Sequence, residues 1–208
     1  MRKSFLIVVF GLILLANTIP ASTSQQDQTE RTVTVQPIRS VPKDKRWALI
    51  IGIDKYEDSS ITPLSGADND ARSLRDALVR YCGFDKEQII TLTSDSSTDL
   101  QPKRANILTR LANLRNVVPP DGFLIVSYSG HGIERNGNAF LLPMDVRGIN
   151  DASLLEDTAI SIKRVTDYIR TTGTKQLMVM IDACRNDPAA GKGDADNQLT
   201  TGFADGFD

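Results

Sequence analysis

Apolar runs and amphipathic stretches alternate through the middle of the chain. Four short apolar runs have the pattern of strands that are covered on both faces: residues 47–53, 88–93, 123–128 and 176–181. Between these runs, apolar side chains at helical spacing predict three helices: residues 67–81, a helix that Pro102 opens, and residues 162–169. Strands and helices that alternate in this way favour a parallel sheet with helices on both faces. We therefore expect a mainly parallel, three-layer α/β/α sandwich.

Capping and turn-forming residues mark the ends of these elements. Gly83 and Gly173 follow two of the predicted helices, where glycine commonly ends a helix in a left-handed conformation. Ser161 precedes the last helix and is predicted to cap its N-terminus. The Asn136-Gly137-Asn138 stretch predicts a hairpin turn that leads into the apolar residues 139–142.

The two ends of the chain differ in composition from this alternating region. Residues 1–21 have the basic, apolar and small-residue parts of a secretory signal peptide, and the apolar part is shorter than the roughly 20 residues of a membrane span. Residues 22–44 are interpreted as a flexible linker, residues 45–186 as the folded domain, and residues 187–208 as an exposed loop or an unfinished domain edge. We expect a secreted or periplasmic protein. The alternative is an uncleaved N-terminal segment that anchors it to a membrane.

Length, charge and cysteine content narrow the class of protein. The chain has 208 residues, of which 40% are hydrophobic, and one domain is the expected organisation. A net charge of -2 without a basic run argues against nucleic acid or an anionic membrane surface as a partner. Cys82 and Cys184 are too few for a disulfide framework. A single bridge between them is the alternative to two free thiols, which we favour because a thiol at a strand end suits a reactive role.

Two of the apolar runs end in reactive side chains. His131, the only histidine, follows one run and Cys184 follows the other. Parallel strands end at the same edge of a sheet, which is where open α/β sheets bind ligands. An imidazole can take the proton of a neighbouring thiol and so make it nucleophilic. Taken singly, a histidine or a buried cysteine is more often structural, but their pairing predicts a catalytic dyad, with the N–H groups of Gly132 and Cys184 as oxyanion donors.

The residues around this pair carry a resemblance to a known family. They read Ser129-Gly130-His131-Gly132 and Asp182-Ala183-Cys184-Arg185, and the cysteine follows the histidine by about 50 residues, as in caspases. From about Arg46 to Asn186 the chain resembles the caspase-like cysteine peptidases, most closely those of metacaspase type. The resemblance implies a caspase-like fold and endopeptidase activity. Caspase-like folds have further core strands in a small subunit after the nucleophile, so we expect this chain to lack the last strands, as a fragment or as a truncated domain.

Substrate preference follows from a departure from the caspase pattern. Caspases that cleave after aspartate have glutamine two residues before the cysteine and line the pocket with arginines, whereas this chain has Asp182 at that position. In metacaspases the aspartates that match Asp70 and Asp182 bind a basic side chain, with Ser129 nearby. An acidic pocket attracts arginine or lysine and repels aspartate. We therefore expect a protein or peptide substrate that is cleaved after Arg or Lys.

Other points of comparison with metacaspases leave alternatives open. Many metacaspases have a cysteine where this chain has Ala67, and many require calcium. Glu156 and Asp157 are the acids that best match part of a calcium site, but the sequence around them differs, so we expect no metal ligands and no cofactor, with Ca²⁺ as the alternative. The leading hypothesis is an exported cysteine endopeptidase. The alternative is a catalytically silent caspase-like module that binds partners or assembles, and the sequence does not indicate an oligomeric state.

Overall fold

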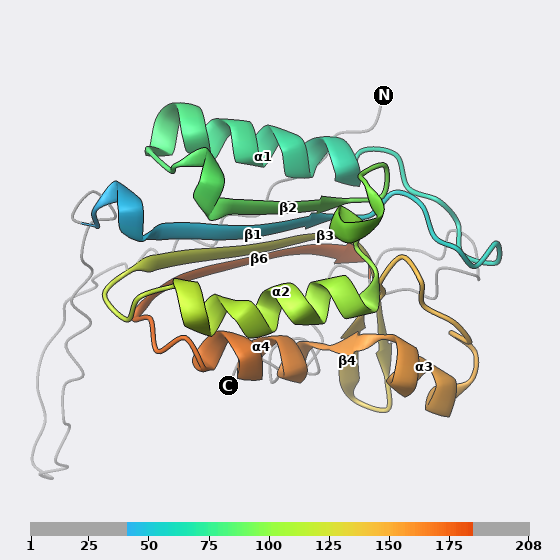
Figure 1. Cartoon of the computed structure of the whole chain (residues 1–208). Helices are drawn as coiled ribbons and strands as arrows, with labels where there is room; N and C mark the ends of the chain where they lie inside the picture. The colour runs from blue at the N-terminus through green and yellow to red at the C-terminus, as the bar shows by residue number, and fades with distance from the viewer. Residues whose placement is uncertain (1–40, 185–208) are drawn as a thin grey trace, which may run out of the picture. The chain divides into compact units, whose positions relative to one another are not determined.

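A computed structural model describes residues 41–184 of the chain (Figure 1). The strands are β1 (Arg46–Gly52), β2 (Ile89–Thr93), β3 (Phe123–Arg135), β4 (Asn138–Leu141), β5 (Ile160–Ser161) and β6 (Gln176–Cys184). The α-helices are α1 (Ala67–Cys82), α2 (Arg104–Val117), α3 (Ala152–Thr158) and α4 (Ile162–Arg170). Three short 3-10 helices precede β1, β2 and α2: η2 (Lys43–Lys45), η3 (Lys86–Gln88) and η4 (Thr98–Leu100).

The strands form one sheet whose centre is β3. The strand β1 pairs in parallel with β2 on one side and with β3 on the other, and β6 pairs in parallel with β3. The last part of β3 extends beyond β1 and pairs with β4 in antiparallel orientation, and β4 pairs with β5. The sheet is therefore parallel over β2, β1, β3 and β6 and antiparallel at the end formed by β4 and β5 (Figure 1). The expected three-layer sandwich with a mainly parallel sheet is confirmed.

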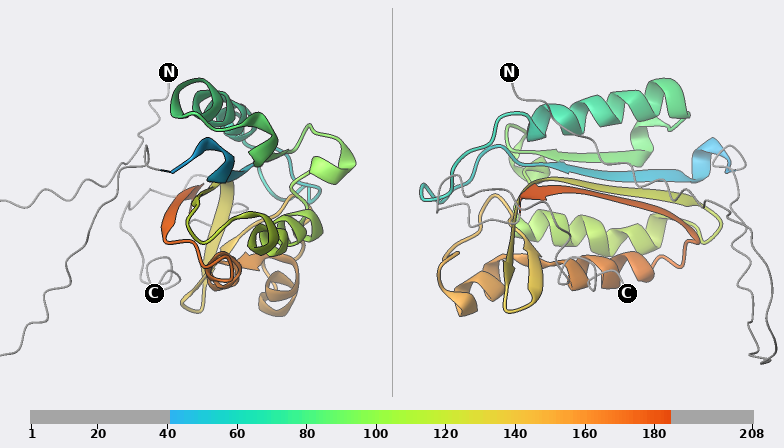
Figure 2. Two further views of the ribbon diagram at one scale, coloured as in Figure 1. Left: turned by 60° about the vertical axis from the view of Figure 1, so that its left-hand side comes forward. Right: turned by 180° about the vertical axis from the view of Figure 1, so that it is seen from behind.

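Helices cover both faces of the parallel strands, with α1 on one face and α2 and α4 on the other (Figure 2). The face under α1 packs alternate side chains of β1 and β3, among them Ile50 and Ile125, against Ala71 and Leu78 of the helix. The residues between these, such as Leu49, point into the larger core under α2 and α4. Strand alternation therefore divides each apolar run between two cores, as expected for strands buried on both sides.

The predicted caps and turns are present at the ends of the elements. Gly83 and Gly173 both have left-handed backbones, with φ of 69° and 68°. The Ser161 hydroxyl accepts a hydrogen bond from the Arg164 N–H and caps α4. Asn136 and Gly137 both have positive φ, as a two-residue hairpin turn between β3 and β4 requires.

The structure differs from the sequence-based expectations at a few boundaries. Strand β3 continues past the apolar run to Arg135, because it pairs with β6 as far as His131 and with β4 from Gly132 onward. Helix α3 and strand β5 are short and were not indicated by the periodicity. Val41, which falls in the expected linker, is buried against the core under α1, so the folded domain begins before Lys45. The expected signal peptide and the segment 187–208 lie outside the described residues.

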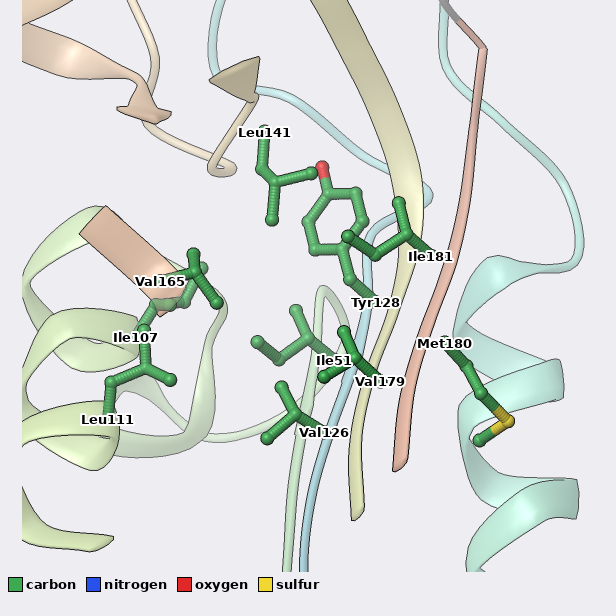
Figure 3. A pocket seen from close by; sticks show the side chains of 10 residues that line it. All are labelled: Ile51, Ile107, Leu111, Val126, Tyr128, Leu141, Val165, Val179, Met180 and Ile181. Carbon is green, nitrogen blue, oxygen red and sulfur yellow. The ribbon is translucent and has the colours of Figure 1, made fainter. Parts of the chain in front are cut away.

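A narrow apolar pocket lies between the sheet and helices α2 and α4 (Figure 3). Its lining is almost entirely aliphatic, with Tyr128 as the one aromatic residue. Nine of the side chains that line it converge from the sheet and from both helices: Ile51, Ile107, Leu111, Val126, Tyr128, Leu141, Val165, Val179 and Ile181. Met180 borders the pocket too, but its side chain points to the opposite face of the sheet, toward α1 (Figure 3). The pocket lies within the sandwich and not beyond the strand ends, so we interpret it as a packing gap in the core. Within residues 41–184, no helix is long and apolar enough to span a membrane.

Candidate active site

The histidine and the cysteine lie side by side at the ends of two paired strands. Strands β3 and β6 run in parallel register from the pair Phe123 and Gln176 to the pair His131 and Cys184. Directly paired strands lie about 4.8 Å apart, so the backbone of Cys184 is next to that of His131. The two reactive positions are thus brought together by one strand register. Cys184 is the last described residue, and the residues after it lie outside the described part of the chain.

The imidazole of His131 is buried, and within the described residues only one of its two nitrogens is hydrogen-bonded. The residue is 6% exposed, and Nε2 lies 2.8 Å from the carbonyl oxygen of Thr62. A carbonyl only accepts, so this contact places the proton on Nε2. Nδ1 is buried as well and has no hydrogen-bond partner within residues 41–184. The lone pair of Nδ1 is therefore available to accept a proton from a neighbouring group.

The backbone of His131 is also held at both of its polar groups. Its N–H donates to the hydroxyl oxygen of Tyr56 at 2.8 Å. Its carbonyl oxygen accepts from the Tyr128 hydroxyl at 2.7 Å and from the Leu142 N–H at 3.0 Å. These contacts come from the β1–α1 loop, from β3 itself and from the residue after β4. Three separate segments therefore fix the position of the histidine.

Burial lowers the pKa of His131 below its usual value of 6.5, because the charged imidazolium loses hydration. The hydrogen bond to the Thr62 carbonyl acts in the opposite direction and is the smaller effect. At neutral pH the side chain is consequently the neutral imidazole, which is the form that can act as a base.

Gly132 follows the histidine at the point where β3 turns from its parallel to its antiparallel partners. It lies opposite Leu141 of β4. The hydrogen bond from the Leu142 N–H to the His131 carbonyl makes this a non-hydrogen-bonded pair. The N–H of Gly132 is therefore directed away from β4, toward the side of β3 on which β6 lies.

The polar residues expected to bind substrate lie one pair further back along the same strands. Ser129 of β3 is directly opposite Asp182 of β6, and on its other side it pairs with Gly52 of β1. Asp182 is exposed and Ser129 is half-buried. Met180, two residues before Asp182, packs in the core under α1. Strand alternation therefore places Asp182 on the sheet face that α1 covers.

Helix α1, which carries Asp70, packs on this face through a close contact with the end of β1 that was not predicted from the sequence. Asp70 is exposed in the first turns of α1. A Cβ atom on Gly52 would lie 2.3 Å from the carbonyl oxygen of Ala67 and 2.9 Å from Cβ of Ala71. Only glycine leaves room for the start of α1 against the end of β1. The register from Gly52 through Ser129 to Asp182 places Ser129 and Asp182 on the sheet face that α1, the helix of Asp70, covers.

Asp54 fixes the start of α1 and was also missed. One carboxylate oxygen accepts from the N–H groups of Gly66 and Ala67, at 3.0 and 2.9 Å, and the other accepts from that of Asp68 at 3.3 Å. N–H groups at a helix start have no partner within the helix, so Asp54, two residues after β1, caps α1. A Gly-x-Asp stretch at the end of β1 is the sequence signal that was available.

The two acids in the first turn of α1 have different environments. Asp68 is buried and accepts the Ser94 N–H at 3.0 Å, which ties α1 to the residue after β2. Burial is the main cause that raises the pKa of Asp68. Asp70 is exposed and is therefore the acid of this turn that a substrate can reach.

Glu156 and Asp157, the acids considered for calcium, lie on the short helix α3. No group of three or more His, Cys, Asp or Glu side chains in the described residues is arranged to hold a metal ion.

Cys82 is an exposed free cysteine at the end of α1. The carbonyl oxygen of Cys82 accepts a hydrogen bond from Arg46 at the start of β1, whereas Cys184 lies at the end of β6.

Comparisons with known proteins identify relatives of this chain. The chain is 29% identical to metacaspase-1 of Eremothecium gossypii over 69% of its length, and 39% identical to metacaspase-1 of Cryptococcus neoformans over 42% of its length. It spans 32% and 19% of these two relatives. A crystal structure of a Geobacter sulfurreducens protein matches with a TM-score of 0.52 at 15% identity, covering 67% of this chain and 50% of that one. The family profile "Caspase domain" matches residues 45–205. The chain therefore belongs to the caspase domain family.

Proposed function

We propose that this chain carries the dyad of a cysteine endopeptidase, with Cys184 as the nucleophile and His131 as the base. The observation that carries the proposal is the strand register that pairs His131 with Cys184, next to a buried Nδ1 without a partner in the described residues. Membership of the caspase domain family and the similarity to metacaspases support the same activity.

The proposed reaction uses the two groups in sequence. Nδ1 of His131 takes the proton of the Cys184 thiol, and the thiolate sulfur forms a bond to the carbonyl carbon of the substrate. The tetrahedral oxyanion accepts hydrogen bonds from the N–H groups of Gly132 and Cys184. The C–N bond then breaks, and the imidazolium gives its proton to the leaving amine. Water, deprotonated by His131, attacks the thioester, and the thiol leaves with the proton restored.

We propose that the substrate residue before the cleaved bond is Arg or Lys. Asp182 and Ser129 are directly paired, and the start of α1, with Asp70, lies against the end of β1 next to them. Asp70 and Asp182 are both exposed, so a substrate can reach their carboxylates. Two carboxylates favour a cationic side chain and repel an anionic one.

The test compares fluorogenic peptides that differ only in this residue. We expect turnover of Arg and Lys peptides, little turnover of the Asp peptide, and loss of all turnover in Cys184→Ala. Cys82→Ala is the matched control, because it removes the exposed cysteine of α1 and should leave turnover unchanged. Turnover that survives Cys184→Ala would rule out the proposed nucleophile. Equal rates with Asp and Arg peptides would rule out the acidic pocket.

A second candidate function is a catalytically silent module that binds a partner. The observation that favours it is the exposure of Leu177 and Met178 on β6, at 44% and 41%. A thiol-reactive probe that carries a basic residue separates the two candidates. Labelling of Cys184, read by peptide mass spectrometry, supports the peptidase. Labelling of Cys82 alone supports the silent module.

We further propose that the protein is exported by residues 1–21 and acts without a metal. The basic and apolar composition of these residues supports export. N-terminal sequencing of the secreted protein would show cleavage near residue 21, whereas an intact N-terminus in the membrane fraction would show an anchor. Activity that is unchanged by a chelator would support metal-independence, and activity restored only by Ca²⁺ would contradict it.

A further inference from the structure

Tyr56 contacts His131 in two ways, although the two residues are far apart in the sequence. The ring centroids of the two side chains are 5.2 Å apart, with an angle of 39° between the ring planes. The hydroxyl oxygen of Tyr56 accepts the backbone N–H of His131 at 2.8 Å. One side chain therefore lies against the imidazole and also holds the backbone from which the imidazole extends.

The same loop provides the carbonyl that binds the other end of the imidazole. Tyr56 and Thr62 both belong to the connection between β1 and α1, and the Thr62 carbonyl oxygen lies 2.8 Å from Nε2. Ile61, next to Thr62, is buried in a core cluster with side chains of β4 and α3. The β1–α1 loop thus contacts the face of the imidazole and its Nε2, while Nδ1 has no partner in residues 41–184.

Several interactions hold this loop in place independently of His131. Glu57, next to Tyr56, forms ion pairs with Lys103 at 2.8 Å and with Arg147 at 2.9 Å. Its N–H donates to the Met144 carbonyl at 2.8 Å. At the other end of the loop, the Leu64 N–H donates to the Asp54 carbonyl at 2.8 Å. The loop is therefore anchored on both sides of the segment that contacts the imidazole.

The chemistry of the Tyr56 hydroxyl argues for a positioning role rather than for proton transfer. Burial raises the pKa of Tyr56 well above its ordinary value, so the phenol is protonated at neutral pH. The hydroxyl of Tyr128 lies nearby and donates to the carbonyls of His131 and Leu142. A Cβ on Gly130 would lie 2.8 Å from the Tyr128 hydroxyl and 3.2 Å from that of Tyr56. The glycine before the histidine thus leaves room for both phenols.

We propose that Tyr56 is a positioning residue for His131: its ring sets the orientation of the imidazole, and its hydroxyl fixes the backbone of the histidine. This inference rests on the proposed role of His131 as the base. A residue that fixes the base contributes to the rate and not to substrate affinity, because the substrate contacts expected at Asp70 and Asp182 do not involve it.

Three variants separate the ring from the hydroxyl in the full-length protein. Tyr56→Phe keeps the ring, Tyr56→Leu removes it, and Tyr168→Leu makes the same change in α4, where Tyr168 packs against the core away from the site. We expect Tyr56→Leu to lower kcat by about tenfold or more, since a misplaced catalytic group can cost up to a hundredfold. KM should change by less than about twofold. Tyr56→Phe should keep more of kcat than Tyr56→Leu, and Tyr168→Leu should leave kcat unchanged.

A second measurement follows the imidazole without any substrate. His131 is the only histidine, so an NMR pH titration of labelled histidine reports on this side chain alone. Loss of the ring of Tyr56 exposes the imidazole, so its pKa should rise toward the ordinary value in Tyr56→Leu. The pKa should not change in Tyr168→Leu.

The outcomes distinguish this inference from the proposed function. If the wild type neither cleaves peptides nor reacts at Cys184, the proposed function fails, whatever the histidine titration shows. If the wild type is active but Tyr56→Leu and Tyr168→Leu match it in kcat and in histidine pKa, the positioning role is wrong. If Tyr56→Leu does not fold, the test passes to Tyr56→Phe: a shifted histidine signal with a lowered kcat supports the role, and wild-type values in both overturn it.

Discussion

The two strands that carry the candidate dyad differ in how completely they are buried. Strand β3 lies between β1 and β6 and is covered on both faces, whereas β6 pairs with β3 alone among the described strands. The register partners Leu124 and Leu177 show the contrast, since the first is fully buried and the second is 44% exposed. The base therefore extends from the central strand, and the proposed nucleophile from the outermost of the described strands on that side.

This difference in burial bears on how His131 and Cys184 are held in the site. His131 is held by Tyr56, Thr62 and Tyr128 before any substrate arrives. Preorganised groups of this kind lower the cost of reaching the transition state. Among the described residues, the far edge of β6 pairs with no other strand, and main-chain groups at such an edge can pair with another segment. We infer that the contacts around His131 hold it in position before substrate binds.

The largest expected effect is on stability, and it comes from the same substitution at paired positions of β3 and β6. Leu124→Ala should lower the free energy of unfolding by about 2 to 5 kcal/mol, because it leaves a cavity in a packed core. Leu177→Ala, the same change at the paired position, should cost less than about 1 kcal/mol, since its side chain is already half in water. Urea unfolding measures both values. Equal losses would show that β6 is as well packed as β3.

A smaller effect is expected where α1 meets the end of β1. Gly52→Ala should destabilise the protein by about 1 to 3 kcal/mol, because the new methyl group meets the backbone of Ala67. Peptidase activity should fall as well, since the start of α1, which carries Asp70, has to move. Thermal unfolding and peptide turnover test the two effects. Wild-type stability in Gly52→Ala would contradict the close approach of α1 to β1.

Loss of the Asp54 cap on α1 should have a somewhat smaller effect. Asp54→Ala should cost about 1 to 2 kcal/mol, since three helix N–H groups lose their acceptor. KM for Arg peptides should rise, because Asp70 lies in the turn that follows. Asp151→Ala is the matched control: it removes the aspartate that caps α3, through the Leu154 N–H. A loss of stability without a change in KM is expected there, and a rise in KM in both variants would contradict the link between the cap and the site.

The smallest expected effect is a pH dependence that His131 contributes to stability. Its folded-state pKa lies below the ordinary 6.5, so between these values the unfolded chain binds more protons than the folded one. Stability from this source is complete above pH 6.5 and falls as the pH drops toward the folded-state pKa. Urea unfolding at pH 7.5 and 5.5 should therefore show a larger decrease in the wild type than in His131→Gln. Asp68, whose pKa is raised, acts in the opposite direction, but it is present in both proteins.

Much of the fold could be predicted from the sequence because the signals are local. The four apolar runs became β1, β2, β3 and β6, and Gly83, Gly173 and Ser161 ended or capped helices as expected. The short elements α3 and β5 escaped prediction, because a few residues give too little periodicity for a helix or a strand to be recognised.

The sequence by itself determined which residues are the candidates for the chemistry. Each of His131 and Cys184 stands at the end of an apolar run, and the order of strands and helices placed both ends at one edge of a sheet. Their exact pairing, and that of Ser129 with Asp182, depends on the register between β3 and β6. Register is decided by packing between segments that are distant in the chain, so the sequence alone could not provide it.

Only the tertiary structure decided what surrounds the histidine. Tyr56 and Thr62 lie in a polar loop without periodicity, and each reaches His131 across a long separation in the chain. Gly52 and Asp54 likewise act through contacts with the start of α1. Nothing in the sequence pattern around Tyr56 and Thr62 distinguishes them from other residues of polar loops. Their roles arise because folding removes the imidazole from water and leaves it only the partners that the neighbouring segments provide.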